Sequence, residues 1–146
     1  MANLSLDEVD LQILQCLLEN ALSSNKEIGE RVHLTGQAVG ARVRKLRDMG
    51  VIEGYTLRWN PDKLGQRVLA FITVYMNTNT AHEAFRRFAE ASHEIVEMHR
   101  ISGEGCYWLR ARAAGIVELN RLLEELLKFG NYKLALSLEK VKLSEF

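Results

Sequence analysis

The fold is decided by residues 24–55, SNKEIGERVHLTGQAVGARVRKLRDMGVIEGY. Ser24 stands three residues before Glu27, the capping-box spacing that opens a helix. Thr35 is a second N-cap residue, and the His33-Leu34 pair before it predicts a tight turn. Apolar residues recur at helical spacing on both sides of that turn. The stretch therefore predicts two short helices joined by a turn, which is a helix-turn-helix.

A further helix is predicted ahead of this pair. Residues 6–20 carry apolar side chains at helical spacing, and Ser5 with Glu8 repeats the capping-box pattern, so we expect this helix to begin after Ser5. At the far end of the stretch, Gly50 suits the left-handed residue that closes a helix. The alternating residues 51–59 then predict a strand or a small wing. The only proline follows at Asn60-Pro61-Asp62, and we expect the domain boundary near this point.

From Arg67 onward the pattern predicts strand, helix, strand, strand, helix and strand. The predicted elements cover residues 68–76, 80–91, 95–102, 106–113, 116–129 and 132–143. Their expected inward-facing helical residues are Ala84, Phe85 and Phe88, then Leu119, Leu122, Leu123, Leu126 and Leu127. This order is that of a ferredoxin-like βαββαβ domain, whose antiparallel sheet has helices on one face only.

The expected fold class is therefore α+β, with two domains. We expect residues 1–53 to form a (winged) helix-turn-helix domain and residues 54–66 a linker strand or hinge. Residues 67–146 then form the ferredoxin-like domain, which we expect to serve oligomerisation. The second face of its sheet must be buried, so we expect self-association through strand residues such as Val74, Tyr75 and Trp108.

Charge is patterned along the chain although it sums to zero, with 19 basic and 19 acidic residues. Between Arg31 and Asn60 there are six basic residues against two acidic ones, whereas residues 1–30 hold one basic residue against six acidic ones. Positive charge gathered on one helix after a short turn is typical of a nucleic-acid-binding surface. Basic residues on a helix are also commonly just a solvated face, so the charge alone does not identify a DNA site.

Several function classes are disfavoured by the sequence. There is no apolar run of the roughly 20 residues that a membrane-spanning helix needs, and the acidic N-terminus is unlike a secretory signal, so we expect a cytoplasmic protein. Cys16 and Cys106 lie far apart without a ligand spacing, so no metal or other cofactor is expected. An enzyme remains an alternative because of His33, His82, His93 and His99, but none of them forms a base–nucleophile pattern with another residue.

Five motifs carry a resemblance to a known family. They are D-x-x-D-x-x-I-L at residues 7–14, E-I-G-x-x-V-x-L-T at 27–35, V-x-x-R-V-x-x-L-x-x-x-G-V-I-x-G-Y at 39–55, N-P-x-x-L-G at 60–65 and I-S-G-x-x-C-Y at 101–107. The chain resembles the leucine-responsive regulator/AsnC family, also called feast/famine regulators. The resemblance implies a DNA-binding transcription regulator whose C-terminal domain dimerises through its sheet and assembles further, often into octamers. Many members sense amino acids at the interface between dimers.

The second helix of a helix-turn-helix enters the major groove of double-stranded DNA. In that geometry Gln37 suits adenine, and small residues allow contact with thymine methyl groups. Arg42, where the family carries an arginine, suits phosphate or guanine, and Arg44 and Lys45 suit phosphates. Gly40 is explained equally by a close approach to DNA or to a neighbouring helix. The candidate DNA-binding residues are Thr35, Gly36, Gln37, Ala38, Ala41, Arg42, Arg44 and Lys45.

The resemblance also implies an effector site at the glycine turn. Relatives that bind amino acids usually read G-x-x-D-Y there, and Cys106 replaces the aspartate in this chain. A ligand's amino group would lose an acidic partner, for which Glu104 is a substitute. The glycines are also explained by a tight turn alone. The candidate effector residues are Gly103, Glu104, Gly105, Cys106, Tyr107, Ser137 and Glu139.

The function predicted from these residues and from the resemblance is sequence-specific transcription regulation by a homo-oligomer, with modulation by an amino acid or another small molecule. A dimer would present two recognition helices to half-sites about one DNA turn apart, which predicts a roughly palindromic operator. The alternative is an architectural protein that bends or compacts DNA with little sequence preference and without an effector. Salt dependence and competition with unrelated DNA distinguish the two, because purely electrostatic binding has no specificity ratio.

Overall fold

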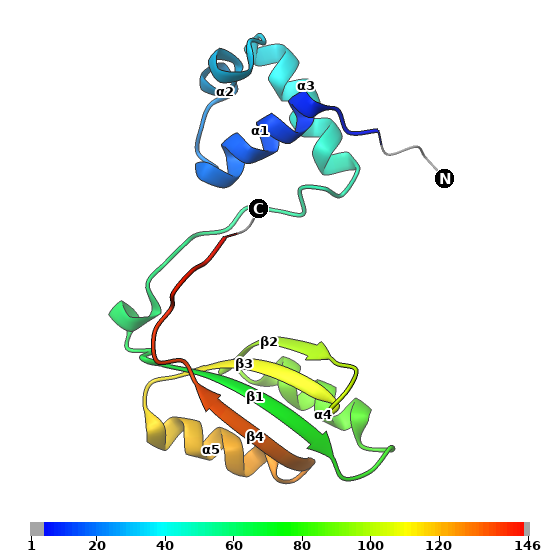
Figure 1. Ribbon diagram of the computed structural model, residues 1–146, viewed down its shortest axis with the longest axis vertical. Helices are drawn as coiled ribbons and strands as arrows, with labels where there is room; N and C mark the ends of the chain where they lie inside the picture. The colour runs from blue at the N-terminus through cyan, green and yellow to red at the C-terminus, as the bar shows by residue number, and fades with distance from the viewer. Residues whose placement is uncertain (1–4, 145–146) are drawn as a thin grey trace. The chain divides into compact units, whose positions relative to one another are not determined.

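The structure is a computed structural model that describes residues 5–144 (Figure 1). The chain divides into two compact units. One consists of the N-terminal residues up to Arg58 together with those from Lys142, and the other is Trp59–Val141. Among the helices of residues 5–144, none is long and apolar enough to cross a membrane.

The N-terminal unit is a bundle of three helices. They are α1 (Glu8–Glu19), α2 (Asn25–Val32) and α3 (Gly36–Asp48). Their apolar stripes meet in one core, because each helix carries its large apolar residues at helical spacing on one side. The buried members of that core are Ile13, Cys16, Ile28, Val32, Val39 and Leu46. The predicted helix-turn-helix is confirmed.

The caps of α2 and α3 lie where the sequence predicts them, but the cap of α1 does not. Ser24 and Glu27 form a capping box, and the Thr35 side chain accepts a hydrogen bond from the Ala38 N–H. The prediction of Ser5 as the cap of α1 is wrong. Asp7 is the N-cap, and its carboxylate and that of Asp10 each accept a hydrogen bond from the other residue's backbone N–H. A carboxylate serves the N-cap position as well as a hydroxyl group does, which explains why Asp7 can occupy it.

The predicted wing is also wrong, because residues 51–59 contain no strand. The backbone N–H groups of Val51 and Ile52 both donate to the Leu46 carbonyl oxygen, at 2.9 and 3.1 Å. Both side chains pack against the helical core. The alternation of apolar residues therefore arises from the way the chain packs as it leaves α3, and it does not indicate a paired strand. Beyond it, Pro61–Leu64 forms a short 3₁₀-helix, η1.

The C-terminal unit has the predicted βαββαβ order. Its elements are β1 (Val68–Met76), α4 (His82–Ala91), β2 (Ile95–Arg100), β3 (Tyr107–Ala113), α5 (Ile116–Leu126) and β4 (Gly130–Leu136). The strands form one antiparallel sheet in the order β2-β3-β1-β4, and Figure 1 shows both helices on the same side of it. The ferredoxin-like fold is confirmed. The last strand is shorter than predicted, since its pairing with β1 ends at Leu136 opposite Ala70.

The core of this unit lies between the sheet and the two helices. Alternate residues of β1, among them Ile72 and Val74, are fully buried against the leucines of α5. Three sequence predictions are corrected here. Val74 belongs to this buried face and not to the open one, while Ala84 and Leu127 are exposed. Leu127 lies just beyond the last residue of α5, so the helical spacing that predicted its burial no longer applies.

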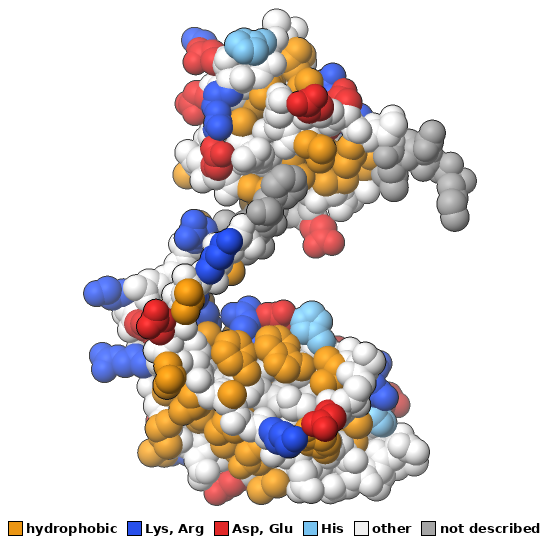
Figure 2. All heavy atoms as spheres, in the orientation of Figure 1, with side chains coloured by type: hydrophobic (Ala, Val, Ile, Leu, Met, Phe, Trp, Pro, Cys, Tyr) orange, Lys and Arg blue, Asp and Glu red, His pale blue; other side chains and the backbone are white. Residues whose placement is uncertain are grey.

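The other face of the sheet is not covered by any helix of this unit. The residues of β1 and β3 that point away from the helices include Phe71 and Trp108, whose rings stack with centroids 5.7 Å apart. Figure 2 shows apolar side chains gathered over this unit, with charged groups among them. Tyr75, on the same side of β1 as Phe71, lies beneath the Lys133 ammonium group, 5.6 Å from the ring centroid. The open face is thus a mixed aromatic and charged surface.

Candidate DNA-binding face and ligand-binding turn

Helix α3 has a buried side and an exposed side. Val39, Gly40 and Leu46 are buried in the helical unit. Gln37, Ala41 and Arg44 are exposed and follow each other at spacings of four and three residues, so they form one stripe along the helix. Of the other candidate residues, Thr35 is exposed, and Gly36 and Ala38 are half-buried at the start of the helix. We call Gln37, Ala41 and Arg44 the α3 stripe.

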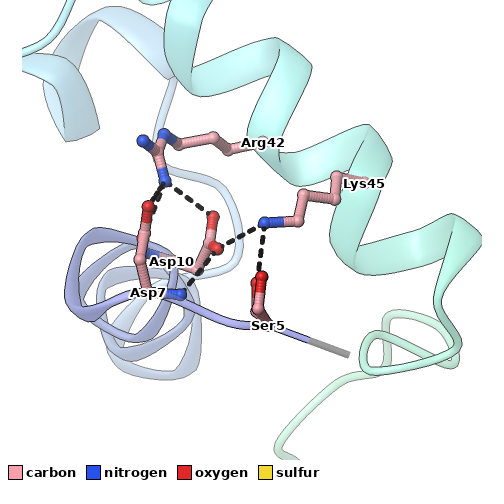
Figure 3. A network of polar contacts seen from close by, with 5 residues as sticks. All are labelled: Ser5, Asp7, Asp10, Arg42 and Lys45. Carbon is pink, nitrogen blue, oxygen red and sulfur yellow. Dashed lines mark hydrogen bonds and ion pairs between the residues drawn. The ribbon is translucent and has the colours of Figure 1, made fainter. Parts of the chain in front are cut away.

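Two of the predicted DNA-binding residues have partners inside the unit (Figure 3). Arg42 donates to both carboxylate oxygens of Asp7, at 2.7 and 2.6 Å, and to Asp10 at 3.0 Å. Lys45 donates to Asp10 at 2.7 Å and to the Ser5 carbonyl oxygen at 3.3 Å. These contacts join α3 to the start of α1. The structure thus gives Arg42 and Lys45 a structural role, and their contact with DNA stays a prediction.

Asp10 is the centre of this network. Its side chain is fully buried, and burial alone would raise the pKa of its carboxyl group. The hydrogen bonds from Lys45, the Asp7 backbone and Arg42 outweigh burial and lower that pKa to about 2. The Arg42 hydrogen bond likewise lowers the pKa of Asp7. Asp10 is therefore a buried anion, and it is stable because two cations and a backbone N–H surround it.

This pairing changes the charge that α3 offers to a ligand. The Arg44 side chain forms no hydrogen bond or ion pair with the described part of the chain. Arg47 lies over the Tyr55 ring, 5.8 Å from its centroid. Both arginines, with Asp48 and Glu53, line a surface hollow of about 340 Å³. Arg44 and Arg47 are the cations of α3 without a carboxylate partner among residues 5–144, fewer than the sequence suggests.

Three backbone features set the turn between α2 and α3. His33 has a left-handed φ of 59°, and the Leu34 N–H donates to the Gly29 carbonyl oxygen at 2.9 Å. A Cβ on Gly29 would overlap the Leu34 carbonyl oxygen, so this glycine is required by the turn itself. A Cβ on Gly40 would lie 3.1 Å from the Asn25 side-chain nitrogen of α2. Of the two explanations for Gly40, the approach of a neighbouring helix is the one with a contact in the structure.

The glycine turn between β2 and β3 is tight. Gly103 and Gly105 have φ values of 88° and 86°, which favour glycine. A Cβ on Gly105 would lie 2.5 Å from the Thr73 methyl carbon. The Cys106 N–H donates to the Val74 carbonyl oxygen at 2.8 Å, which places the turn beside the end of β1. The glycines are therefore explained by the turn without a ligand.

The remaining candidate effector residues are not gathered at this turn. Glu104 is exposed and pairs with Lys133 at 3.3 Å, and Cys106 is half-buried. The Ser137 N–H donates to the Leu69 carbonyl oxygen at the opposite end of β1. Ser137 and Glu139 line a separate hollow of about 360 Å³. Within one chain, then, the two halves of the predicted effector site lie at opposite ends of the sheet.

Tyr107, another of the candidate effector residues, is buried on the helix-covered side of the sheet. Its hydroxyl group is contacted by His82, Arg86 and Arg100. None of these three is among the predicted DNA-binding or effector-binding residues. Asp7 and Asp10 were also missed, although the D-x-x-D spacing opposite the basic residues of α3 is a signal for them.

Charged groups on the open face are arranged around Glu97. His99 and Arg110 each approach its carboxylate to 2.7 Å, and they lower the pKa of Glu97, His99 more than Arg110. The side chain of the neighbouring Arg112 forms no hydrogen bond or ion pair with any described residue, and burial lowers its pKa although the charge of Asp62 opposes that shift. A guanidinium group held partly out of water without a hydrogen-bond acceptor is poorly satisfied.

Two family profiles match the chain. Residues 6–53 match the winged helix-turn-helix DNA-binding family, and residues 69–145 match the Lrp/AsnC ligand binding domain. The HTH-type transcriptional regulator LrpB of Bacillus subtilis is 43% identical over 139 residues, which are 95% of this chain and 93% of LrpB. The leucine-responsive regulatory protein of Escherichia coli K12 is 34% identical over 124 residues, covering 84% of this chain and 76% of that protein.

Solved structures agree with the sequence relatives. A transcriptional regulator of Neisseria meningitidis, solved in complex with L-Met, superimposes with a TM-score of 0.91 at 27% identity, over 97% of this chain and 95% of that one. Bacillus subtilis LrpC has a TM-score of 0.90 at 25% identity, over 96% of this chain and 99% of LrpC. The three-helix unit, the ferredoxin-like unit and these relatives lead to one conclusion: the chain belongs to the Lrp/AsnC family of helix-turn-helix transcriptional regulators, and it is not an enzyme.

Proposed function

We propose that this protein recognises specific double-stranded DNA sequences through the α3 stripe. The observation that carries the proposal is the exposure of Gln37, Ala41 and Arg44 on one side of the second helix of a helix-turn-helix. In the major groove, Gln37 is suited to adenine, Ala41 to close approach and Arg44 to phosphate. Arg42 and Lys45 then act mainly by holding α3 against α1.

The ion pairs of Arg42 and Lys45 favour sequence reading over architectural binding. Non-specific binding depends on the number of phosphates that cations neutralise. Two cations of α3, Arg42 and Lys45, are already neutralised by Asp7 and Asp10 at the start of α1. The whole protein has no net charge. A surface with few free cations must obtain its affinity from base contacts and from several binding helices acting together.

We propose that two copies associate through the open face of the sheet. Phe71 and Trp108 form an aromatic patch there, and the Arg112 side chain has no hydrogen bond or ion pair within residues 5–144. Burial of aromatic rings is a strong driving force for association, and a two-fold interface uses the same patch on both copies. Such a dimer would carry two α3 stripes for two half-sites, and further assembly would add more.

For the effector, we propose an amino acid, with the site completed by a second chain. The match to a ligand-binding domain and the L-Met complex of the Neisseria regulator support this ligand class. The turn that contains Cys106 and the segment that contains Ser137 lie too far apart along β1 to share a small ligand within one chain.

We place the protein in the cytoplasm, on the nucleoid.

Binding to DNA tests the proposal. The wild-type protein is titrated onto DNA from upstream of its own gene and onto unrelated DNA of equal length, over a range of salt concentrations. A preference of about a thousandfold or more supports specific recognition. Equal affinities that fall steeply with salt would support the architectural alternative and overturn the proposal.

A further inference from the structure

Three polar side chains meet at one buried hydroxyl group on the helix-covered side of the C-terminal unit. The Tyr107 hydroxyl oxygen lies 2.9 Å from His82 Nδ1, 3.2 Å from Arg86 Nε and 3.4 Å from a terminal nitrogen of Arg100. His82 and Arg86 are four residues apart on α4, and Arg100, the last residue of β2, pairs with Tyr107 across the sheet. The cluster is therefore built from three elements of the fold.

Most donors and acceptors of this cluster can be assigned from their chemistry, although the Tyr107 O–H and Arg100 share the one lone pair of His82 Nδ1. Arginine can only donate, so Arg86 and Arg100 donate to the tyrosine oxygen. The tyrosine O–H is then left to donate to His82 Nδ1, which also lies 2.8 Å from Arg100. His82 accepts at Nδ1 and carries its own proton on Nε2. Both guanidinium groups also lie over the tyrosine ring, at 5.9 and 5.3 Å from its centroid. The arginines are thus held in fixed positions.

Neither of these two cations forms an ion pair with the part of the chain that the structure describes. Within residues 5–144, no carboxylate pairs with Arg86 or Arg100, although the neighbouring Arg87 pairs with Glu83. Because both guanidinium groups reach the same oxygen atom, they are close to each other and repel. Each uses few of its five N–H groups on tyrosine and histidine, and both side chains are exposed to solvent. A ligand from solution can therefore reach the unused donors.

We propose that Arg86 and Arg100 form a binding site for a small organic anion with a carboxylate or phosphate group. Such a ligand supplies the missing negative charge, and two fixed guanidinium groups suit its oxygen atoms. Tyr107 and His82 are positioning residues that orient the arginines. The proposal rests on the ligand-binding role proposed for this unit, and it adds a second kind of ligand contact, on the side of the sheet away from its open face.

The test uses the full-length protein without DNA and without an amino acid, so it fails or succeeds separately from the proposed function. The thermal midpoint is measured with sodium malonate, with inorganic phosphate, with neutral malonamide and with sodium chloride at matched ionic strength. We expect malonate or phosphate to raise the midpoint above the chloride control and malonamide to leave it unchanged. A response to malonate alone identifies a carboxylate site, and a response to phosphate alone a phosphate site.

Variants locate the site. We expect Arg86→Gln and Arg100→Gln each to weaken binding of the active anion about tenfold or more. Arg121→Gln, which removes an exposed arginine of α5, is the matched control and should bind as the wild type does. Arg86→Lys keeps the positive charge and shows whether a loss of binding comes from the lost guanidinium group or from misfolding. We expect it to fold normally and to bind with intermediate affinity. Midpoints equal to those in chloride, or wild-type affinity in both glutamine variants, would overturn the proposal.

Discussion

Lys45 on α3 donates a 2.7 Å hydrogen bond to Asp10 on α1, and the Asp10 side chain is fully buried. Arg42 reaches the other oxygen of the same carboxylate. One aspartate therefore fixes the DNA-binding helix against the helix that supports it. It also removes two cations from the charge that α3 presents to DNA, so the specificity of the domain depends on few residues.

The first prediction concerns the stability that Asp10 gives by holding α3 against α1. Asp10→Asn removes the buried negative charge and leaves Arg42 and Lys45 without it. Because the pKa of Asp10 falls from 3.8 to about 2 on folding, we expect the free energy of unfolding at pH 7 to drop by about 2 kcal/mol. Chemical denaturation followed by circular dichroism measures it. An unchanged free energy of unfolding would show that the network does not stabilise the fold.

The pH dependence of the same variant is the second prediction. A carboxyl group whose pKa is lowered by folding stabilises the folded state above its unfolded pKa and loses that contribution as the pH falls. For Asp10 the loss occurs between about pH 4 and pH 2. We expect the wild type to lose more stability over this window than Asp10→Asn does. Parallel curves for the two proteins would contradict the assignment.

The third prediction concerns the turn between α2 and α3. Gly29→Ala places a methyl group against the Leu34 carbonyl oxygen, so the turn must shift. We expect a loss of about 2 kcal/mol in the free energy of unfolding, as for an overpacked site. Gly54→Ala is the matched control, since nothing lies within 4 Å of its added carbon, and it should change stability by less than about 0.5 kcal/mol. Equal effects of the two substitutions would argue against the close contact.

The fourth prediction concerns Arg44. Arg44→Gln removes an exposed cation that has no carboxylate partner among the described residues, so the fold should be unaffected. We expect weaker binding to specific and unrelated DNA alike, with the slope of log affinity against log salt reduced by about one per DNA-bound chain. Fluorescence anisotropy at several salt concentrations measures both quantities. If the salt slope stays at its wild-type value, Arg44 does not contact a phosphate.

The fifth prediction concerns self-association. Trp108→Glu places a charge on the aromatic patch of the open sheet face, beside Phe71. We expect the assembly to dissociate toward the 16.6 kDa monomer in sedimentation velocity. Val117→Glu is the control, because Val117 is exposed on α5, on the other side of the unit. An assembly that survives Trp108→Glu but not Val117→Glu would place the interface on the helices.

The sequence predicted the elements of this fold well and their ends less well. Helical spacing and caps identify α2 and α3, since Ser24 and Thr35 are the obvious starts. At α1 the sequence predicted Ser5 as the N-cap, whereas Asp7 holds that position and forms a capping box with Asp10. Alternation at residues 51–59 was misleading because a strand requires a partner, which no local pattern supplies.

Pairing across the fold explains what the sequence left unpredicted at the site. Arg42 and Lys45 are DNA-binding candidates by position, and their ion pairs with Asp7 and Asp10 bridge more than thirty residues of sequence. The residues around the Tyr107 hydroxyl come from α4, β2 and β3, so no spacing in the sequence identifies them. The separation of Cys106 from Ser137 likewise follows from the register of β1 with its neighbours.

Recognition of bases by α3 is the central claim, and Gln37→Ala tests it most directly. Gln37 is exposed, so its removal should leave the fold unchanged. The measurement is the ratio of affinities for DNA from upstream of the protein's own gene and for unrelated DNA, for the wild type and the variant in the same buffer. We predict that this ratio falls about tenfold, because a lost bidentate base contact costs roughly 1–3 kcal/mol, while affinity for unrelated DNA is unchanged. An unaltered ratio would contradict the claim that Gln37 and the α3 stripe read the sequence.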